Sequence, residues 1–285
     1  MSALTRRVWI AGLGIVAVAG AGAVGYRVWR DQEPAAPPTQ DEAGQLVWRN
    51  WSGNQHAYPS ARLAPASEDE VAALLRTAQG PIRPVGAGHS FTALVPTAGT
   101  LVTLDGVTGL VSHDASTHEA TLWAGTKLGD LGPALAAIGQ EMANLPDINK
   151  QSFGGAIATA THGTGRELRA LHGEIQSLRI ATPRGDILEC SAAQHAGLFE
   201  AAKVGLGAYG IVTQARIRNQ PLKRVFKRVS LMDQEEAYAR WFEVVSAHRN
   251  AEMYFIPFTG LAALITLDET ERRCARADPI RTQRF

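Results

Sequence analysis

A short turn of small residues ends at a histidine, and it is the first stretch of this sequence that could do chemistry. The turn consists of Gly86, Ala87, Gly88, His89 and Ser90. It follows residues 82–85, a predicted strand. Glycines let backbone amides approach a ligand that a Cβ would repel, and consecutive N–H groups form a concavity suited to phosphate oxygens. The turn therefore predicts either an anion-binding loop with a histidine at its rim, or a plain tight turn in which the histidine caps a backbone carbonyl.

A second stretch, residues 152–165, consists almost wholly of Gly, Ala, Ser and Thr. Side chains this small fill little of a core. The composition therefore predicts a loop whose backbone lies close to another group rather than one held by side-chain packing. The presence of both loops favours a shared ligand over two unrelated turns.

Together the two loops resemble the FAD-binding half of the vanillyl-alcohol oxidase family, which has the p-cresol-methylhydroxylase (PCMH) type of fold. The sequence is most similar to the branch of sugar-1,4-lactone and alditol oxidases. Residues 50–54 and 205–213 carry further motifs, and the resemblance spans residues 45–222. It implies an α+β fold with a two-subdomain PCMH-type FAD-binding domain at 45–222. The beginning of an antiparallel-sheet substrate domain is implied at 223–285.

The resemblance also implies roles for individual residues. In these relatives the histidine of the turn is bonded covalently to the flavin, so His89 is the implied attachment point. The implied cofactor-binding residues are Gly86, Ala87, Gly88, His89, Ser90, Ser152, Gly154, Gly155, Thr159, His162, Gly163, Gly210 and Ile211. Ser152 is also a candidate for the substrate side of the ring, and a purely structural role suits His162 equally well. No catalytic base is assigned, because the family's substrate-binding charged groups come from later in the substrate domain.

The implied activity is FAD-dependent oxidation of an alcohol carbon on an aldono-1,4-lactone or an alditol. A hydride would pass to flavin N5, and oxygen would reoxidise the flavin and give hydrogen peroxide. One alternative is a dehydrogenase of the same fold that passes electrons to a quinone or a cytochrome. Another is a flavin-binding fragment without turnover. It arises because residues 268–285 are rich in arginine and unlike a continuing sheet. They predict a substrate domain that is truncated or altered in reading frame, and therefore a poor catalyst.

The spacing Gly205-x-Gly207-x-x-Gly210 matches the dinucleotide-binding fingerprint as a string. That motif must follow a strand and open a helix. Here residues 195–204 predict a helix and residues 211–217 predict a strand, so the order is reversed. The sequence therefore argues against a nicotinamide site, and the glycines instead predict close packing or approach to the cofactor.

Composition sets the remaining limits. The chain has 285 residues, 45% hydrophobic and 19% charged, which is typical of a folded protein with a substantial core. A formal net charge of +1 argues against a nucleic-acid partner. The two cysteines form no disulfide framework, and the eight histidines show no spacing typical of a metal site.

The N-terminus carries a separate signal. Arg6 and Arg7 precede the uncharged residues 8–26, a run close to the roughly 20 residues that span a bilayer. Twin arginines before a glycine-rich apolar segment indicate an export signal or a membrane anchor, whereas the glycines disfavour a buried core helix. We therefore expect residues 1–30 to direct export from a bacterial cell, to the periplasm or to the inner membrane. Residues 31–44 are the expected linker.

The rest of the chain predicts alternating helices and strands. Ser67 and Glu70 form a capping-box pattern, so a helix at 68–79 should lead into the strand at 82–85 in a β–α–β-like opening. The other expected strands are a meander at 101–104, 110–113 and 120–124, a hairpin at 176–181 and 186–189, and the strands 224–231, 253–258 and 261–267. The other expected helices are 128–138, with Pro133 near its first turn, and 234–247.

Overall fold

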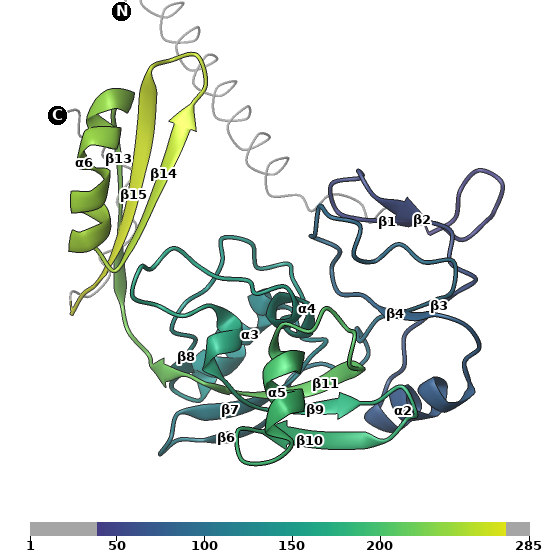
Figure 1. Cartoon of the computed structure of the whole chain (residues 1–285). Coiled ribbons are helices and arrows are strands. Elements are labelled where there is room, and N and C mark those ends of the chain that lie inside the picture. The colour runs from purple at the N-terminus through teal and green to yellow at the C-terminus, as the bar shows by residue number, and fades with distance from the viewer. Residues whose placement is uncertain (1–38, 272–285) are drawn as a thin grey trace, which may run out of the picture. The chain divides into compact units, whose positions relative to one another are not determined.

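The computed structural model describes residues 39–271 (Figure 1). The predicted export segment at 1–30, most of the predicted linker and the tail from residue 272 lie outside the described residues. Within the described range, no helix combines the length and the apolar character that crossing a membrane requires. The assignment of residues 45–222 and 223–285 to separate domains stays a prediction.

A small parallel sheet precedes the larger one in the chain. β5 (Thr100–Val102) lies between β3 (Ala61–Leu63) and β4 (Ile82–Pro84) and pairs parallel with both. Helix α2 (Glu68–Thr77) connects β3 to β4, which confirms the predicted β–α–β opening. The predicted meander is wrong at its first strand. All three residues of β5 are buried between parallel neighbours, as is typical of a parallel sheet.

The N-terminus of α2 has the predicted cap. The Ser67 side chain accepts a hydrogen bond from the Glu70 amide at 3.1 Å, and the Glu70 carboxylate accepts one from the Ala66 amide at 2.8 Å. Val71 and Leu75 then face the core of the small sheet. Local sequence chemistry therefore fixes where this helix begins and which face it buries.

The larger sheet is antiparallel, with strand order β10-β9-β11-β7-β6. Its strands are β6 (Leu110–Asp114), β7 (Glu119–Trp123), β9 (Ile175–Ala181), β10 (Ile187–Ser191) and β11 (Ile211–Arg218). β9 and β10 form the predicted hairpin, in which the Gly185 amide donates to the Thr182 carbonyl at 2.8 Å. Gly185 has a φ of +79°, a conformation that glycine adopts without strain.

Three helices pack on one face of the larger sheet (Figure 1). These helices are α3 (Leu128–Ala137), α4 (Phe153–Ala158) and α5 (Ala196–Lys203). Leu131, Phe153 and Ile180 are fully buried in the core between them. α3 begins at the predicted residue, and Pro133 lies just past its first turn. Pro133 has no N–H to donate, and burial of three leucines on the same helix offsets that loss. The short elements are η1 (Leu171–Glu174) and the pair β8 (Gln140–Glu141) with β12 (Gln220–Pro221).

The third main sheet is antiparallel, as predicted. β15 (Leu261–Glu269) is central, between β13 (Val225–Asp233) and β14 (Asn250–Ile256). Helix α6 (Gln234–Ala247) begins at Asp233, whose carboxylate accepts from the Glu235 amide at 2.8 Å. α6 buries Ala237 and Val244 against this sheet.

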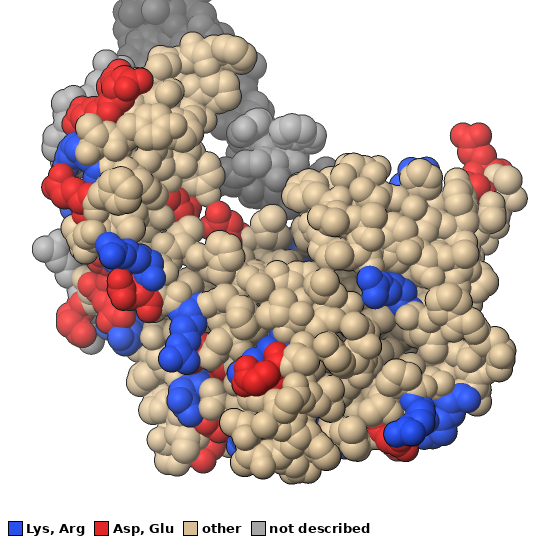
Figure 2. All heavy atoms as spheres, viewed as in Figure 1, with Lys and Arg blue, Asp and Glu red and all other residues tan. Residues whose placement is uncertain are grey.

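On the face of the molecule that Figure 2 shows, charged side chains are dispersed rather than gathered by sign. Figure 2 shows small groups of both signs separated by wide uncharged areas on the face in view. This dispersion is in keeping with the small net charge.

A half-buried ion pair joins α2 to the larger sheet. Glu68 accepts from Arg179 Nη2 at 2.6 Å and from the Thr213 hydroxyl at 2.5 Å. Burial by itself raises the pKa of the Glu68 carboxyl. The hydrogen bonds from Arg179 and Thr213 and the charge of Arg179 outweigh burial, and the pKa is lowered overall. The pair therefore fastens the crossover helix to β9 and β11.

We expect Glu68→Ala to lower the free energy of unfolding by about 1–3 kcal/mol, because it leaves the Arg179 guanidinium and the Thr213 hydroxyl short of a partner. A carboxylate whose pKa is lowered on folding contributes stability above its unfolded pKa and loses it as the pH falls through the folded value. Denaturant unfolding of wild type and variant should therefore differ at neutral pH and converge in acid. An equal difference at every pH would contradict this account.

Candidate functional site

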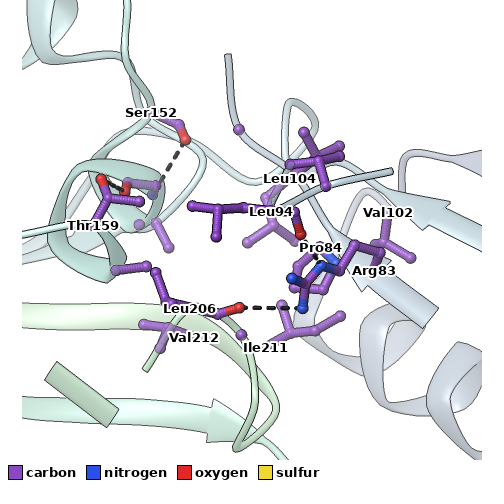
Figure 3. A pocket seen from close by; sticks show the side chains of 18 of the residues that line it. Arg83, Pro84, Leu94, Val102, Leu104, Ser152, Thr159, Leu206, Ile211 and Val212 are labelled. Atoms are coloured by element: carbon purple, nitrogen blue, oxygen red, sulfur yellow. Dashed lines mark hydrogen bonds between the residues drawn. The ribbon is translucent and has the colours of Figure 1, made fainter. Parts of the chain in front are cut away.

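One pocket collects most of the residues that the sequence marks as candidates (Figure 3). It encloses about 1160 Å³ of space, its open mouth included. The predicted residues that line it are Gly86, Ala87, Gly88, His89, Ser90, Ser152, Gly154, Gly155, Thr159, Gly210 and Ile211. Three segments far apart in the chain therefore meet: the turn after β4, the start of α4 and the start of β11.

The first two segments touch at a glycine. A Cβ on Gly86 would overlap the Ser152 hydroxyl, and it would lie 3.7 Å from the Gly155 Cα. The same Ser152 hydroxyl caps α4 by accepting from the Gly155 amide at 3.3 Å. Only a residue without a side chain leaves room for this approach, so the glycine is required for close packing of the two segments.

The stretch predicted as a loop at 152–165 begins as helix α4. Gly154 lies against β7, where its amide donates to the Ala124 carbonyl at 2.8 Å and a Cβ would come within 2.9 Å of the Ala124 side chain. Phe153 is fully buried in the core. The expectation that core packing plays no part here is therefore wrong at Phe153, although the glycines do permit close backbone approach.

The turn after β4 is held from outside by the segment 50–54, which follows β1 (Trp48–Arg49). The Trp51 amide donates to the Gly88 carbonyl at 2.8 Å, and the Asn50 side chain donates to the Ser90 carbonyl at 2.9 Å. Asn50 is buried, and its side-chain oxygen Oδ1 accepts from the Gln55 amide at 3.0 Å. Gly88 has a φ of +70°, which a larger residue adopts only with strain. The resembled motif at 50–54 thus shapes the turn.

His89 is half-buried at the rim of the pocket. Its Nδ1 atom is buried and has no hydrogen-bond partner among the described residues. Burial lowers the pKa of His89 below its ordinary value, because a charged imidazole is poorly solvated there. The structure therefore favours a neutral ring with one nitrogen unpaired, and the alternative in which His89 caps a backbone carbonyl is not seen.

Arg83 is a pocket residue that sequence reasoning missed. Its Nε donates to the Leu94 carbonyl at 2.6 Å and its Nη1 to the Leu206 carbonyl at 3.4 Å, so one side chain ties β4 to two loops (Figure 3). A cation inside a short strand beside the glycine turn was a signal available in the sequence. Further lining residues that were not singled out include Leu104, Asp105, Gly125, Tyr209 and Val212.

The segment 205–210 has the reversed order that the sequence predicts, with α5 before it and β11 after it. Gly207 has a φ of +77°, and a Cβ there would come within 2.8 Å of the Pro84 ring. At Gly210 a Cβ would overlap the Ala181 carbonyl. These glycines therefore serve close packing beside the pocket rather than a helix-opening phosphate loop.

Two candidates are not brought to the pocket. Neither His162 nor Gly163 is among its lining residues. The His162 Nδ1 lies 2.8 Å from the Gly163 carbonyl, and the ring is exposed. A Cβ on Gly163 would overlap the Asn144 side chain, which accounts for the glycine by packing.

The residues present fit a flavin nucleotide. The turn at 86–90 brings the backbones of Gly86 and Gly88 to the wall of the pocket, and His89 has an unpaired nitrogen in the same turn. Apolar residues such as Val85 and Ile211 line the pocket together with these polar groups. A mostly apolar cleft with a few placed polar groups is typical of a cofactor site.

The fold and the site define an FAD-binding domain, and comparison with known proteins agrees. Residues 59–191 match the family described as the FAD binding domain. This match confirms FAD as the cofactor, and the relatives named next confirm the resemblance to FAD-dependent sugar-lactone enzymes.

Individual relatives are enzymes of sugar lactones by name. An L-gulono-1,4-lactone dehydrogenase of Mycobacterium tuberculosis is 34% identical over 230 residues, which cover 80% of this chain and 53% of that protein. A putative D-arabinono-1,4-lactone oxidase of Neurospora crassa is 30% identical over 224 residues, 77% of this chain and 40% of that protein. L-Gulonolactone oxidase of Bos taurus is 30% identical over 179 residues, 62% of this chain and 41% of that protein. The chain spans about half the length, or less, of these relatives.

Proposed function

We propose that this chain takes part in FAD-dependent oxidation of an alcohol carbon on a sugar-derived substrate, an aldono-1,4-lactone in the first place and an alditol in the second. The observation that carries the proposal is the pocket at Gly86, His89 and Ser152, within a domain that matches FAD-binding proteins. The names of the relatives supply the substrate class.

The flavin supplies the hydride acceptor, and the protein supplies position and a shielded environment. The amides of Gly86 and Gly88 and the Ser90 hydroxyl would hold the pyrophosphate, since consecutive backbone N–H groups suit phosphate oxygens. Ser152 and Thr159 would line the opposite wall of the pocket. Arg83 would keep the two flanking loops in place through its bonds to their carbonyls.

His89 is the proposed point of covalent attachment. His89 would supply a ring nitrogen for the bond to the flavin and would give up its proton. The flavin would supply the carbon, which would give up one hydrogen, and oxygen would take up the two electrons and two protons released as hydrogen peroxide. A neutral imidazole is the nucleophilic form, and the lowered pKa of His89 favours it.

The electron acceptor during turnover has two candidates. Oxygen is the first, by analogy with the relatives named oxidases. A quinone or a cytochrome is the second, and the relative named a dehydrogenase favours it.

The deciding experiment is a lactone titration of purified protein without oxygen, followed through the flavin absorbance. Bleaching by L-gulono- or D-arabinono-1,4-lactone supports the proposal. Recovery on adding air, with hydrogen peroxide formed, identifies an oxidase, whereas recovery only with a quinone or cytochrome identifies a dehydrogenase. Bound flavin that no lactone or alditol bleaches would overturn the proposed activity and favour a flavin-binding chain without turnover.

We propose that residues 1–30 direct export of the protein. The alternative is that residues 8–26 attach the exported protein to the inner membrane. We expect replacement of both Arg6 and Arg7 by lysine to leave the precursor in the cytoplasm, because the proposed route recognises both guanidinium groups. Cell fractionation with an antibody measures it. Unchanged export of the double variant would contradict the twin-arginine route.

A further inference from the structure

The indole of Trp51 covers one face of the His89 ring. The two ring centroids are 5.2 Å apart and the planes are inclined by 28°, a stacked arrangement. Phe91 meets the same indole edge-on, with centroids 6.5 Å apart. Trp51 nevertheless remains 61% exposed. An indole so exposed contributes little to the core, so its main contacts are those that its ring makes with His89 and Phe91.

The backbone holds this stack on both sides of the histidine. Before His89, the Gly88 carbonyl accepts from the Trp51 amide at 2.8 Å. After it, the Ser90 carbonyl accepts from the Asn50 side chain at 2.9 Å. Asn50 also donates to the side chains of Ser52 and Asn54, at 3.0 Å and 2.7 Å. The segment 50–54 is therefore a hydrogen-bonded support whose single aromatic side chain, Trp51, lies on His89.

No hydrogen bond to the buried nitrogen fixes the orientation of the His89 ring. Its Nδ1 has no partner among residues 39–271, so the bonds that usually select a tautomer and a rotamer are missing there. The contact that restrains the ring is instead the flat face of Trp51. This covering also withdraws the imidazole from water, in keeping with the lowered pKa of His89.

We propose that Trp51 is a positioning residue for His89: its indole holds the imidazole in the orientation needed to form the bond to the flavin. The inference rests on the proposed covalent attachment at His89. Trp51 acts through the ring of His89 and not on the substrate. Removal of its side chain should therefore slow attachment while the backbone bonds of the turn, and with them non-covalent FAD binding, persist.

The test uses the full chain, produced in riboflavin-starved cells and then mixed with FAD. Trp51→Ala should slow the appearance of flavin that survives denaturation by about tenfold, because the ring loses its stacked partner and its preferred orientation. Trp51→Phe keeps an aromatic face and should recover most of the rate. Phe242→Ala, which removes an 82%-exposed aromatic from α6, is the matched control and should behave as wild type.

A second readout separates positioning from general damage. NMR titration of the labelled imidazole in the FAD-free protein should give a His89 pKa that rises toward the ordinary value in Trp51→Ala and stays low in Trp51→Phe. The dissociation constant for FAD in the His89→Ala background, where only reversible binding occurs, should change less than about twofold when Trp51→Ala is added.

The outcomes distinguish the two proposals. If wild-type protein releases all its FAD on denaturation, the covalent attachment is wrong and the role of Trp51 in it falls as well. If wild type links FAD and Trp51→Ala links it equally fast, the attachment stands and the assignment of Trp51 alone is overturned. A slow Trp51→Ala whose His89 pKa is unchanged and whose FAD affinity has collapsed would show a structural role, and would also overturn the assignment.

Discussion

His89→Ala is expected to abolish all flavin that stays with the polypeptide after denaturation, while FAD still binds reversibly to the folded chain. The substitution removes the only imidazole among the residues that line the pocket. It leaves the amides of Gly86 and Gly88 and the Ser90 hydroxyl in place. Flavin fluorescence of the protein band on a denaturing gel in acid measures the linked fraction, and absorbance of the native protein measures total flavin.

The matched control is His113→Ala, which removes an exposed histidine from β6, away from this pocket. It should keep the same linked fraction as wild type. If flavin washes out of denatured wild-type protein, covalent attachment is wrong and reversible binding alone remains. If His89→Ala keeps linked flavin, another residue is the attachment point.

Local chemistry made several elements predictable. The cap at Ser67 and the glycine turn of the β9–β10 hairpin each depend on residues within a few positions of one another, and both have the predicted form. It was harder to predict which sheet a strand belongs to. The short apolar run of β5 is typical of a meander strand, whereas both of its parallel partners, β3 and β4, come earlier in the sequence and are separated from each other by helix α2. Pairing over such separations leaves no local signal.

The candidate site, like the fold, could be predicted only where the signal lies within a short stretch of sequence. Glycines mark where backbones approach, so the loops at 86–90 and 152–165 could be found from composition. Side chains that reach across the fold could not, because nothing local shows their partners. Arg83 bonds to carbonyls at Leu94 and Leu206, and the second of these lies in a segment far along the chain. Trp51 lies in a recognised motif, but only the structure shows that it stacks on His89.

The second prediction with a large expected effect concerns the contact between the two glycine-rich segments, at Gly86 and Ser152. Gly86→Ala places a methyl group on the Ser152 hydroxyl, so that hydroxyl must turn away and leave the Gly155 amide uncapped. Gly86 does not have a positive φ, so steric overlap rather than backbone strain carries the effect. We expect a loss of about 1–3 kcal/mol in the free energy of unfolding. FAD affinity should fall by about tenfold or more, because the turn shifts against α4.

A double-mutant cycle identifies the cause. Ser152→Ala alone removes the cap and should cost about 1 kcal/mol. In the double variant Gly86→Ala/Ser152→Ala the overlapping oxygen is gone, and the remaining Ser152 Cβ position lies 3.4 Å from the new methyl group, an ordinary contact. The combined loss should therefore be smaller than the sum of the single losses. Gly197→Ala, where a Cβ on α5 meets nothing within 4 Å, is the control and should not destabilise the protein. Denaturant unfolding and FAD titration measure all four variants. Strictly additive losses would show that the Gly86–Ser152 contact does not couple the two segments of the pocket.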